Sequence, residues 1–276
     1  LELMCNHILK EAAERIRTEN DSQTGSEFVR TVIAYLSASR YGLRETDLEE
    51  MIRKGGKEEW NSLLFSQFYR YLRSLFIVRE DGRYDFSHLS IRKAVYSKQD
   101  EKQIHKVIAD CLKGLSEQDP VRMSELLYHC FKADEKEVFW KYLCEVQEKE
   151  ERLLEAAIRG TYEICRIKEG NEWFCAILKA CRPWEDSGRA ESLLTFIYQY
   201  LDTAFGKSPE ELELQRTLYT SGLELAQKLR NELDDEKGMR LLASACYYLG
   251  TVCYRLGGRK NYIQALELYL RERELV

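Results

Sequence analysis

The sequence has few of the features that mark disordered chains, membrane spans and nucleic-acid binders. It holds three prolines in 276 residues, with 44% hydrophobic and 32% charged residues, which predicts an ordered globular chain long enough for two domains. No apolar run approaches the roughly 20 residues that cross a bilayer, so we expect no membrane partner. The formal net charge of -5 leaves no basic excess, which disfavours nucleic acid as a partner.

The cysteines do not follow the spacing of a metal or redox site. Nine are scattered mostly over predicted helices, and no two of them form a Cys-x-x-Cys pair. We interpret them as buried, reduced thiols of a cytoplasmic protein. His129 and Cys130 beside Cys144 would be the only nucleus of a metal site, and we predict that no metal is bound.

The motifs of common catalytic and nucleotide sites are also missing. Gly206-Lys207-Ser208 resembles the end of a phosphate loop, but the position where that loop needs its first glycine is Leu201. No Gly-x-Gly-x-x-Gly, His-Glu-x-x-His or Gly-x-Ser-x-Gly pattern is present. We therefore predict no catalytic residue, no cofactor and no enzymatic activity in this chain.

Apolar residues recur with helical spacing in three segments of the first hundred residues. The segments run from Phe28 to Leu36, from Leu48 to Ile52 and, with the widest apolar stripe, from about Glu58 to Leu75. Thr24 and Glu27 form a capping box at the start of the first segment. These patterns predict three consecutive helices.

The apolar period then changes from helical to alternating. Residues 76–78 and 84–86 alternate on either side of Asp81-Gly82, which supplies the backbone angles of a tight hairpin turn. Ser87 can cap a further helix, from His88 to about Tyr96. Three helices followed by a hairpin predict a winged-helix domain.

Beyond residue 100 the sequence contains helical signals only, separated by short breaks, and one of these helices is expected to run from Arg189 to Phe205. Helices of about 10 to 20 residues joined by short turns favour antiparallel neighbours and, in a long series, a solenoid. Cys246–Tyr254 and Ala265–Tyr269 resemble the two helices of a tetratricopeptide repeat, although the turn between them is about three residues too long.

These patterns together predict a mainly α fold, in which a winged-helix domain with one small β-hairpin precedes an α-helical solenoid. The expected parts are an N-terminal linking helix at 1–24, a winged-helix domain at 25–100, a helical connector at 101–182 and tetratricopeptide-like repeats at 183–276.

His88 is the candidate functional residue of the winged-helix part. It stands at the start of the helix that follows the hairpin, where free N–H groups and the helix dipole favour an anion. The imidazole can have a purely structural role, with hydrogen bonds to its surroundings. Alternatively, a neutral ring N–H can contact a phosphate group that a neighbouring domain supplies.

A winged helix can also read DNA through its third helix. Arg70 and Arg73 are outward basic residues of that helix and would contact the phosphates. Glu58, Glu80 and Asp81 oppose this contact by their charge. The alternative function is therefore a transcription regulator with a DNA-binding winged helix and a helical effector domain.

Several motifs together resemble the NACHT-type signal-transduction ATPases of the STAND class. The segment after their nucleotide-binding domain is similar to Ile33–Leu43, Asp47-Leu48, Trp60 and Phe86-Ser87-His88. The helix from Ile104 to Leu115 and the run Glu125–His129 resemble the next segment of those proteins, which precedes a tetratricopeptide or other repeat sensor. The resemblance covers about Leu9 to Tyr142.

Two positions depart from the pattern of these ATPases. Arg44 stands where they usually carry a helix-capping Ser or Thr, and Thr46 with Glu49 can substitute as a capping box. His88 lacks the Met-His-Asp context of the plant and animal relatives.

The resemblance implies a regulatory and sensor portion of a STAND NTPase. Its partners would be an upstream nucleotide-binding domain in cis and a protein ligand on the helical repeats. The parent protein would bind ATP and ADP, and the resemblance allows it to oligomerise on activation. In related nucleotide switches a winged-helix histidine contacts the ADP phosphate, and by position this implies His88. A plain helical-repeat scaffold is the remaining alternative.

Overall fold

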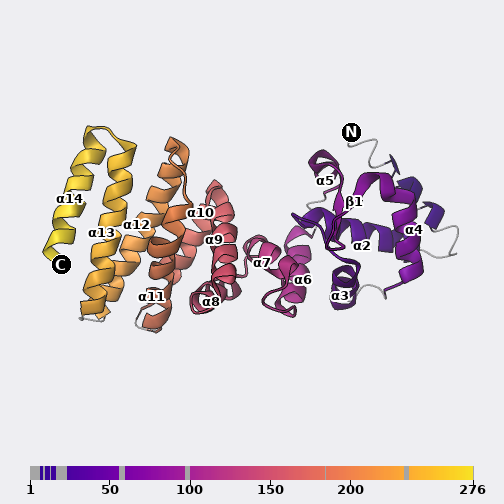
Figure 1. Ribbon diagram of the computed structural model, residues 1–276, viewed down its shortest axis with the longest axis horizontal. Helices are drawn as coiled ribbons and strands as arrows, with labels where there is room; N and C mark the ends of the chain where they lie inside the picture. Colours follow the sequence, from indigo (N-terminus) through magenta and orange to yellow (C-terminus); the bar gives the residue numbers. More distant parts are fainter. Residues whose placement is uncertain are drawn as a thin grey trace. The chain divides into compact units, whose positions relative to one another are not determined.

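The protein is mainly helical with one small sheet, as the sequence predicts. The computed structural model describes residues 7–8, 10–12, 14–16, 24–55, 60–96, 100–183, 185–232 and 236–275. The chain divides into two compact units, Leu1–Asp134 and Glu135–Val276, which are coloured from indigo to magenta and from magenta to yellow in Figure 1. Most of the expected linking helix 1–24, the side chain of Thr24, and Glu58 lie outside the described residues.

The first unit consists of helices and a hairpin. Its elements are α2 (Thr24–Ala38), α3 (Glu45–Gly55), α4 (Ser62–Leu72), η1 (Arg73–Leu75), β1 (Phe76–Val78), β2 (Tyr84–Phe86), α5 (Leu89–Val95), α6 (Glu101–Lys113) and α7 (Pro120–Ala133). The third predicted helix begins at Ser62 rather than near Glu58. The reason is Asn61, whose side-chain oxygen accepts the N–H groups of Leu63 and Leu64, both at 3.0 Å, and so caps α4.

The hairpin is tied to the loop between α2 and α3. Phe76 lies opposite Phe86 in the antiparallel pair β1–β2, and Leu43 forms an isolated bridge to Tyr84. Gly42 makes this approach possible, since its φ is +82° and a Cβ there would lie 2.4 Å from the carbonyl oxygen of Tyr84. The loop therefore acts as a short third strand beside the hairpin.

The helices α6 and α7 complete the first unit. They pack on each other, and α6 also packs against α2 and α3. Residues 101–134, which we assigned to the connector, thus belong to the same compact unit as the hairpin. Their buried apolar side chains, among them Ile108, Leu112 and Leu126, extend the core formed by α2 and α3.

The second unit is a series of helices that pack on their neighbours, consistent with a helical solenoid. Its elements are α8 (Lys136–Val146), α9 (Glu151–Cys165), α10 (Lys168–Ala180), α11 (Ser187–Thr195), η2 (Phe196–Leu201), η3 (Asp202–Ala204), α12 (Pro209–Glu232), α13 (Glu236–Leu256) and α14 (Arg259–Leu275). The last three helices lie side by side in chain order, with α12 against α13 and α13 against α14 (Figure 1).

The helix expected from Arg189 to Phe205 is not a regular α-helix. The α11 helix ends at Thr195 and continues as a π-helix over Phe196–Leu201 and a 3₁₀ turn over Asp202–Ala204. The wider turn seats the fully buried ring of Tyr198 against Gly222, where a Cβ would lie 2.4 Å from the Tyr198 hydroxyl. Packing against α12, which no local pattern reports, therefore decides the helix type here.

Candidate functional site

His88 lies where the hairpin leads into α5. It is the N-cap residue of that helix, and its carbonyl oxygen accepts the N–H of Ile91 at 3.0 Å and that of Arg92 at 3.3 Å. The side chain is exposed and, among the described residues, makes no capping hydrogen bond. Ser87, which we expected to be the cap, lies one residue too early and donates its N–H to the carbonyl of Leu75 at 2.8 Å. The His88 imidazole is therefore accessible to a neighbouring molecule.

The two arginines of the DNA alternative lie near the end of α4 and in η1. Arg70 and Arg73 are both exposed. The Arg70 guanidinium donates to the hydroxyl of Tyr71 at 2.9 Å and lies 4.8 Å from the centre of its ring. Glu80 and Asp81 are exposed on the hairpin turn. The exposed residues of α4, η1 and the hairpin turn thus include both signs of charge, whereas DNA phosphates favour a basic surface.

A buried carboxylate links the hairpin to α5. Asp85, 4% exposed, accepts hydrogen bonds from Arg79 in the hairpin, at 2.6 Å, and from Arg92 in α5. Arg92 also donates to the backbone carbonyl of Arg40 in the α2–α3 loop. Because Asp85 has a cation on either side, the cost of burying its charge is offset. Hairpin, α5 and loop are thus held together by one ion-paired cluster.

A second buried carboxylate links the same loop to α7. The side chain of Glu125 is fully buried and accepts the backbone N–H of Arg40, at 3.0 and 3.1 Å, and that of Tyr41 at 2.7 Å. The Arg40 guanidinium lies 4.7 Å from the ring centre of Tyr128 and donates to the carbonyl of Ser124. The Ser-Arg-Tyr-Gly-Leu run and the Glu125–His129 run, which are far apart in the sequence, therefore meet.

Two buried histidines extend this cluster into α6. Nε2 of His129 lies 3.2 Å from a carboxylate oxygen of Glu125, and its Nδ1 lies 2.7 Å from Nδ1 of His105. Burial lowers the pKa of His105 to about 2, with His129 and Lys132 acting in the same direction. Burial also lowers the pKa of His129, against the opposing effect of Glu125. Both imidazoles are therefore neutral at pH 7.

These contacts also concern the possible metal site at His129, Cys130 and Cys144 that the sequence suggested. Both ring nitrogens of His129 lie within hydrogen-bond distance of protein atoms, so neither is open to a metal ion. No group of three or more potential metal ligands occurs in the part of the chain that the structure describes. The eight described cysteines are free thiols, and burial raises the pKa of several of them, Cys165 most strongly.

Arg44 links the start of α3 to the start of α7. Its backbone N–H donates to the carboxylate of Asp47 at 2.9 Å, and its guanidinium pairs with Asp47 and with Asp119, both at 2.9 Å. The hydrogen bond to Asp47 raises the pKa of Arg44 above its usual value. The expected Thr46–Glu49 capping box is wrong, because Asp47, three residues after Arg44, takes the acidic position of the box.

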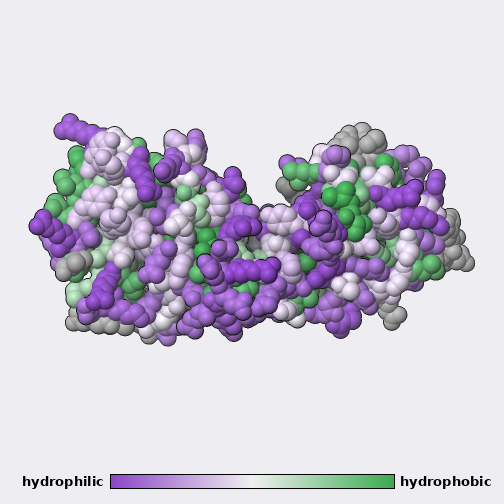
Figure 2. Space-filling model, in the orientation of Figure 1, coloured by the Kyte–Doolittle hydropathy of each residue, from purple (hydrophilic) through white to green (hydrophobic). Residues whose placement is uncertain are grey.

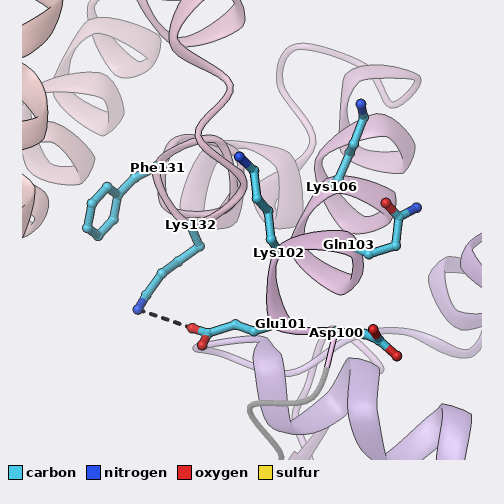
Figure 3. A pocket seen from close by; sticks show the side chains of 7 residues that line it. All are labelled: Asp100, Glu101, Lys102, Gln103, Lys106, Phe131 and Lys132. Atoms are coloured by element: carbon cyan, nitrogen blue, oxygen red, sulfur yellow. Dashed lines mark hydrogen bonds and ion pairs between the residues drawn. The ribbon is translucent and has the colours of Figure 1, made fainter.

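A shallow pocket at the start of α6 and the end of α7 is lined by three lysines among other residues. It is lined by Asp100, Glu101, Lys102, Gln103, Lys106, Phe131 and Lys132 (Figure 3). Lys132 reaches Glu101 at 3.4 Å, and Lys102 pairs with Asp134 at 3.6 Å. Because these carboxylates already neutralise two of the lysines, the pocket does not present the concentrated positive charge that an anion site needs.

Sequence reasoning located His88 but missed the buried cluster that holds its surroundings. The alternation of Tyr84 and Phe86 puts Asp85 on the other face of the strand, where a charged residue is ordinary, so nothing in the local sequence indicated that it is buried. Glu125 and His129 are four residues apart on one helix and could have been paired by that spacing. Their partners Arg40 and His105 are distant in sequence, so no local pattern identifies them.

Comparisons with known proteins add no further constraint. No family model matches the chain, and neither the curated proteins nor the solved structures contain a match. Within the described ranges, no helix has the length and apolar character needed to cross a membrane. Evidence for function therefore comes from the residues and contacts above.

Proposed function

We propose that this chain is the regulatory and sensor portion of a STAND-class NTPase. In this proposal residues 25–100 form a winged-helix domain, and the helices after residue 183 form tetratricopeptide-like repeats that bind a protein ligand. The order of three helices and a hairpin, with Leu43 as a short third strand, supports the first assignment. Since fold alone does not define function, the proposal depends on what the surface of each unit offers.

The observation that carries the proposal is the position of His88. Its imidazole is exposed at the hairpin–α5 junction, and both flanking elements carry exposed apolar side chains, at Ile77 and Val78 in β1 and at Leu89 in α5. Apolar surface over the hairpin and α5 is visible in Figure 2. Exposed apolar side chains on the elements that flank an uncapped imidazole suit a surface that packs against a nucleotide-binding domain, where a ring N–H meets a phosphate oxygen.

The repeat unit offers a second apolar surface. Tyr262, Ile263, Leu266 and Leu270 of α14 are each at least 50% exposed, and Figure 2 shows apolar side chains over this helix. Exposed apolar patches of this kind favour association with other proteins. In the intact protein, ligand capture by the repeats would shift the population towards a state in which the winged helix releases the nucleotide domain.

The proposal is tested by measuring ADP release from the intact parent protein. His88→Ala should accelerate release, because one contact to the phosphate is lost, by about tenfold for a hydrogen bond of roughly 1.5 kcal/mol. His88→Gln keeps a side-chain N–H and should fall between the two. His7→Ala, which changes another exposed histidine, is the matched control. Equal release rates in all four proteins would refute the switch role of His88.

A further inference from the structure

The His105–His129 pair has one consistent arrangement of hydrogens when both rings are neutral. A carboxylate can only accept, so Nε2 of His129 carries the hydrogen that points to Glu125. Nδ1 of His129 is then an acceptor, and the 2.7 Å contact needs the N–H at Nδ1 of His105. This leaves Nε2 of His105 as an acceptor, 3.5 Å from the hydroxyl of Tyr96.

The groups that face the pair carry charges of both signs. They come from the end of α5, from α6, from α7 and from the α2–α3 loop: Tyr96, Glu101, Glu125, Tyr128, Lys132 and Arg40. A carboxylate oxygen of Glu101 lies 3.9 Å from Nε2 of His105, but the same oxygen pairs with Lys132 at 3.4 Å. Arg40 and Lys132 thus oppose protonation of rings that are already shielded from water.

Protonation also conflicts with the geometry of the pair. A proton on His129 would put a second N–H into the 2.7 Å gap, unless His105 moved its own hydrogen to Nε2. With both rings protonated no such exchange is left, and two N–H groups face each other. Separation of α6 from α7 is the direct way to relieve that conflict.

We propose that the His105–His129 pair is an acid-sensitive latch, which holds α7 to α6, and through Glu125 the α2–α3 loop, while both imidazoles are neutral. Opening exposes the rings to water, where each takes up a proton below about pH 6.5. The closed form therefore has its full advantage above about pH 6.5 and loses it as the pH falls below that value. The latch depends only on residues of the first unit and is independent of the proposed NTPase role.

Hydrogen exchange of the whole chain measures the opening directly. The chain has four histidines, all in the first unit, of which His7 and His88 are exposed, so peptides from 135–276 are an internal reference. After correction for intrinsic exchange, the opening equilibrium of α6 and α7 should rise by about a hundredfold per pH unit between roughly pH 6 and pH 5, because two protons are linked to it. The reference peptides should show no such rise. A flat profile in α6 and α7 would overturn the latch.

Substitutions separate the two histidines. His105→Asn keeps a side-chain N–H near the position of Nδ1, and His129→Gln keeps one near the position of Nε2, but neither can be protonated. Each should reduce the pH dependence to about tenfold per unit, and the double variant should abolish it. His7→Gln, which changes another exposed histidine of the first unit, is the matched control and should behave as the unchanged protein does. A double variant that retains the full pH dependence would contradict the proposal.

A measurement on the unchanged protein keeps the test decisive if the variants fail to fold. Imidazole ¹⁵N spectra at pH 7.5 should show a hydrogen only on Nε2 of His129 and only on Nδ1 of His105. These signals should persist unshifted down to the pH at which α6 and α7 open. An imidazolium at either position in the closed form at pH 6.5 would exclude the latch.

Discussion

At the scale of single residues, the protein separates charges that hold the fold together from charges on its surface. Asp85 and Glu125 are almost fully buried and accept several hydrogen bonds each. Exposed pairs such as Arg53–Glu50 connect neighbouring turns of one helix. Exposed pairs contribute little, whereas removing one partner of a buried pair leaves an uncompensated charge.

Asp85→Ala should therefore destabilise the first unit by about 3 kcal/mol, because Arg79 and Arg92 lose their shared partner. Asp81→Ala, in the turn of the same hairpin, removes an exposed partner of Arg83 and should cost less than about 1 kcal/mol. Urea unfolding read by pulsed hydrogen exchange in peptides from 60–96 compares the two. Equal destabilisation by both changes would show that burial of the Asp85 pair has no special role.

At the scale of elements, the hairpin depends on a loop that precedes it by more than thirty residues. The bridge between Leu43 and Tyr84 is closed by two backbone hydrogen bonds, of 3.2 and 2.9 Å. A side chain on Gly42 would meet both a left-handed backbone and the Tyr84 carbonyl, whereas Gly82 at the hairpin turn has the same φ sign and open space around it. A comparison of substitutions at the two glycines therefore separates the free-energy cost of a left-handed backbone from the cost of a steric clash.

Gly82→Ala should cost only the strain of a left-handed residue, about 1 to 2 kcal/mol. Gly42→Ala should cost clearly more, since the bridge to Tyr84 must also open. The free energy of unfolding of the first unit, from urea titration of both variants, gives the difference. A Gly42→Ala protein as stable as Gly82→Ala would mean that the loop does not hold the hairpin.

The helix α14 offers a comparison between its two faces. Leu268 is buried against α13, while Leu266 is 60% exposed. Leu268→Ala should lower the stability of the second unit by about 2 to 4 kcal/mol, whereas Leu266→Ala should change it by less than about 0.5 kcal/mol. Thermal unfolding of the two variants checks this. Leu266→Ala should instead weaken binding of a protein ligand, if the ligand uses the exposed face of α14.

Local patterns predicted most elements because the apolar residues of each helix recur with the helical period. The hairpin was also predictable, since Asp81-Gly82 and the alternation around it act over a few residues. The π-helix at Phe196–Leu201 was not predictable, because it depends on the packing of Tyr198 against Gly222 in α12. The start of α4 was missed for a smaller reason, as the cap at Asn61 competes with an apolar pattern that begins earlier.

At the scale of the whole molecule, a network of contacts in the first unit links the hairpin to the helices α6 and α7. Arg40 and its neighbours in the α2–α3 loop contact α5 through Arg92 and α7 through Glu125. A change at His88, at the surface of this unit, is thereby linked by contiguous contacts to α6 and α7. The position of His88 followed from local sequence, but this linkage is made by residues up to 85 positions apart.

Residues 24–134 should therefore behave as one cooperative body that carries His88. Native-state hydrogen exchange of the chain and of Glu125→Ala is the decisive test, with Glu50→Ala as an exposed control. Glu125→Ala removes the carboxylate that accepts the N–H groups of Arg40 and Tyr41, and we expect it to lower the opening free energies of α7, the α2–α3 loop and the hairpin together, by about 3 kcal/mol. Faster exchange confined to α7, with an unchanged hairpin, would contradict this cooperativity.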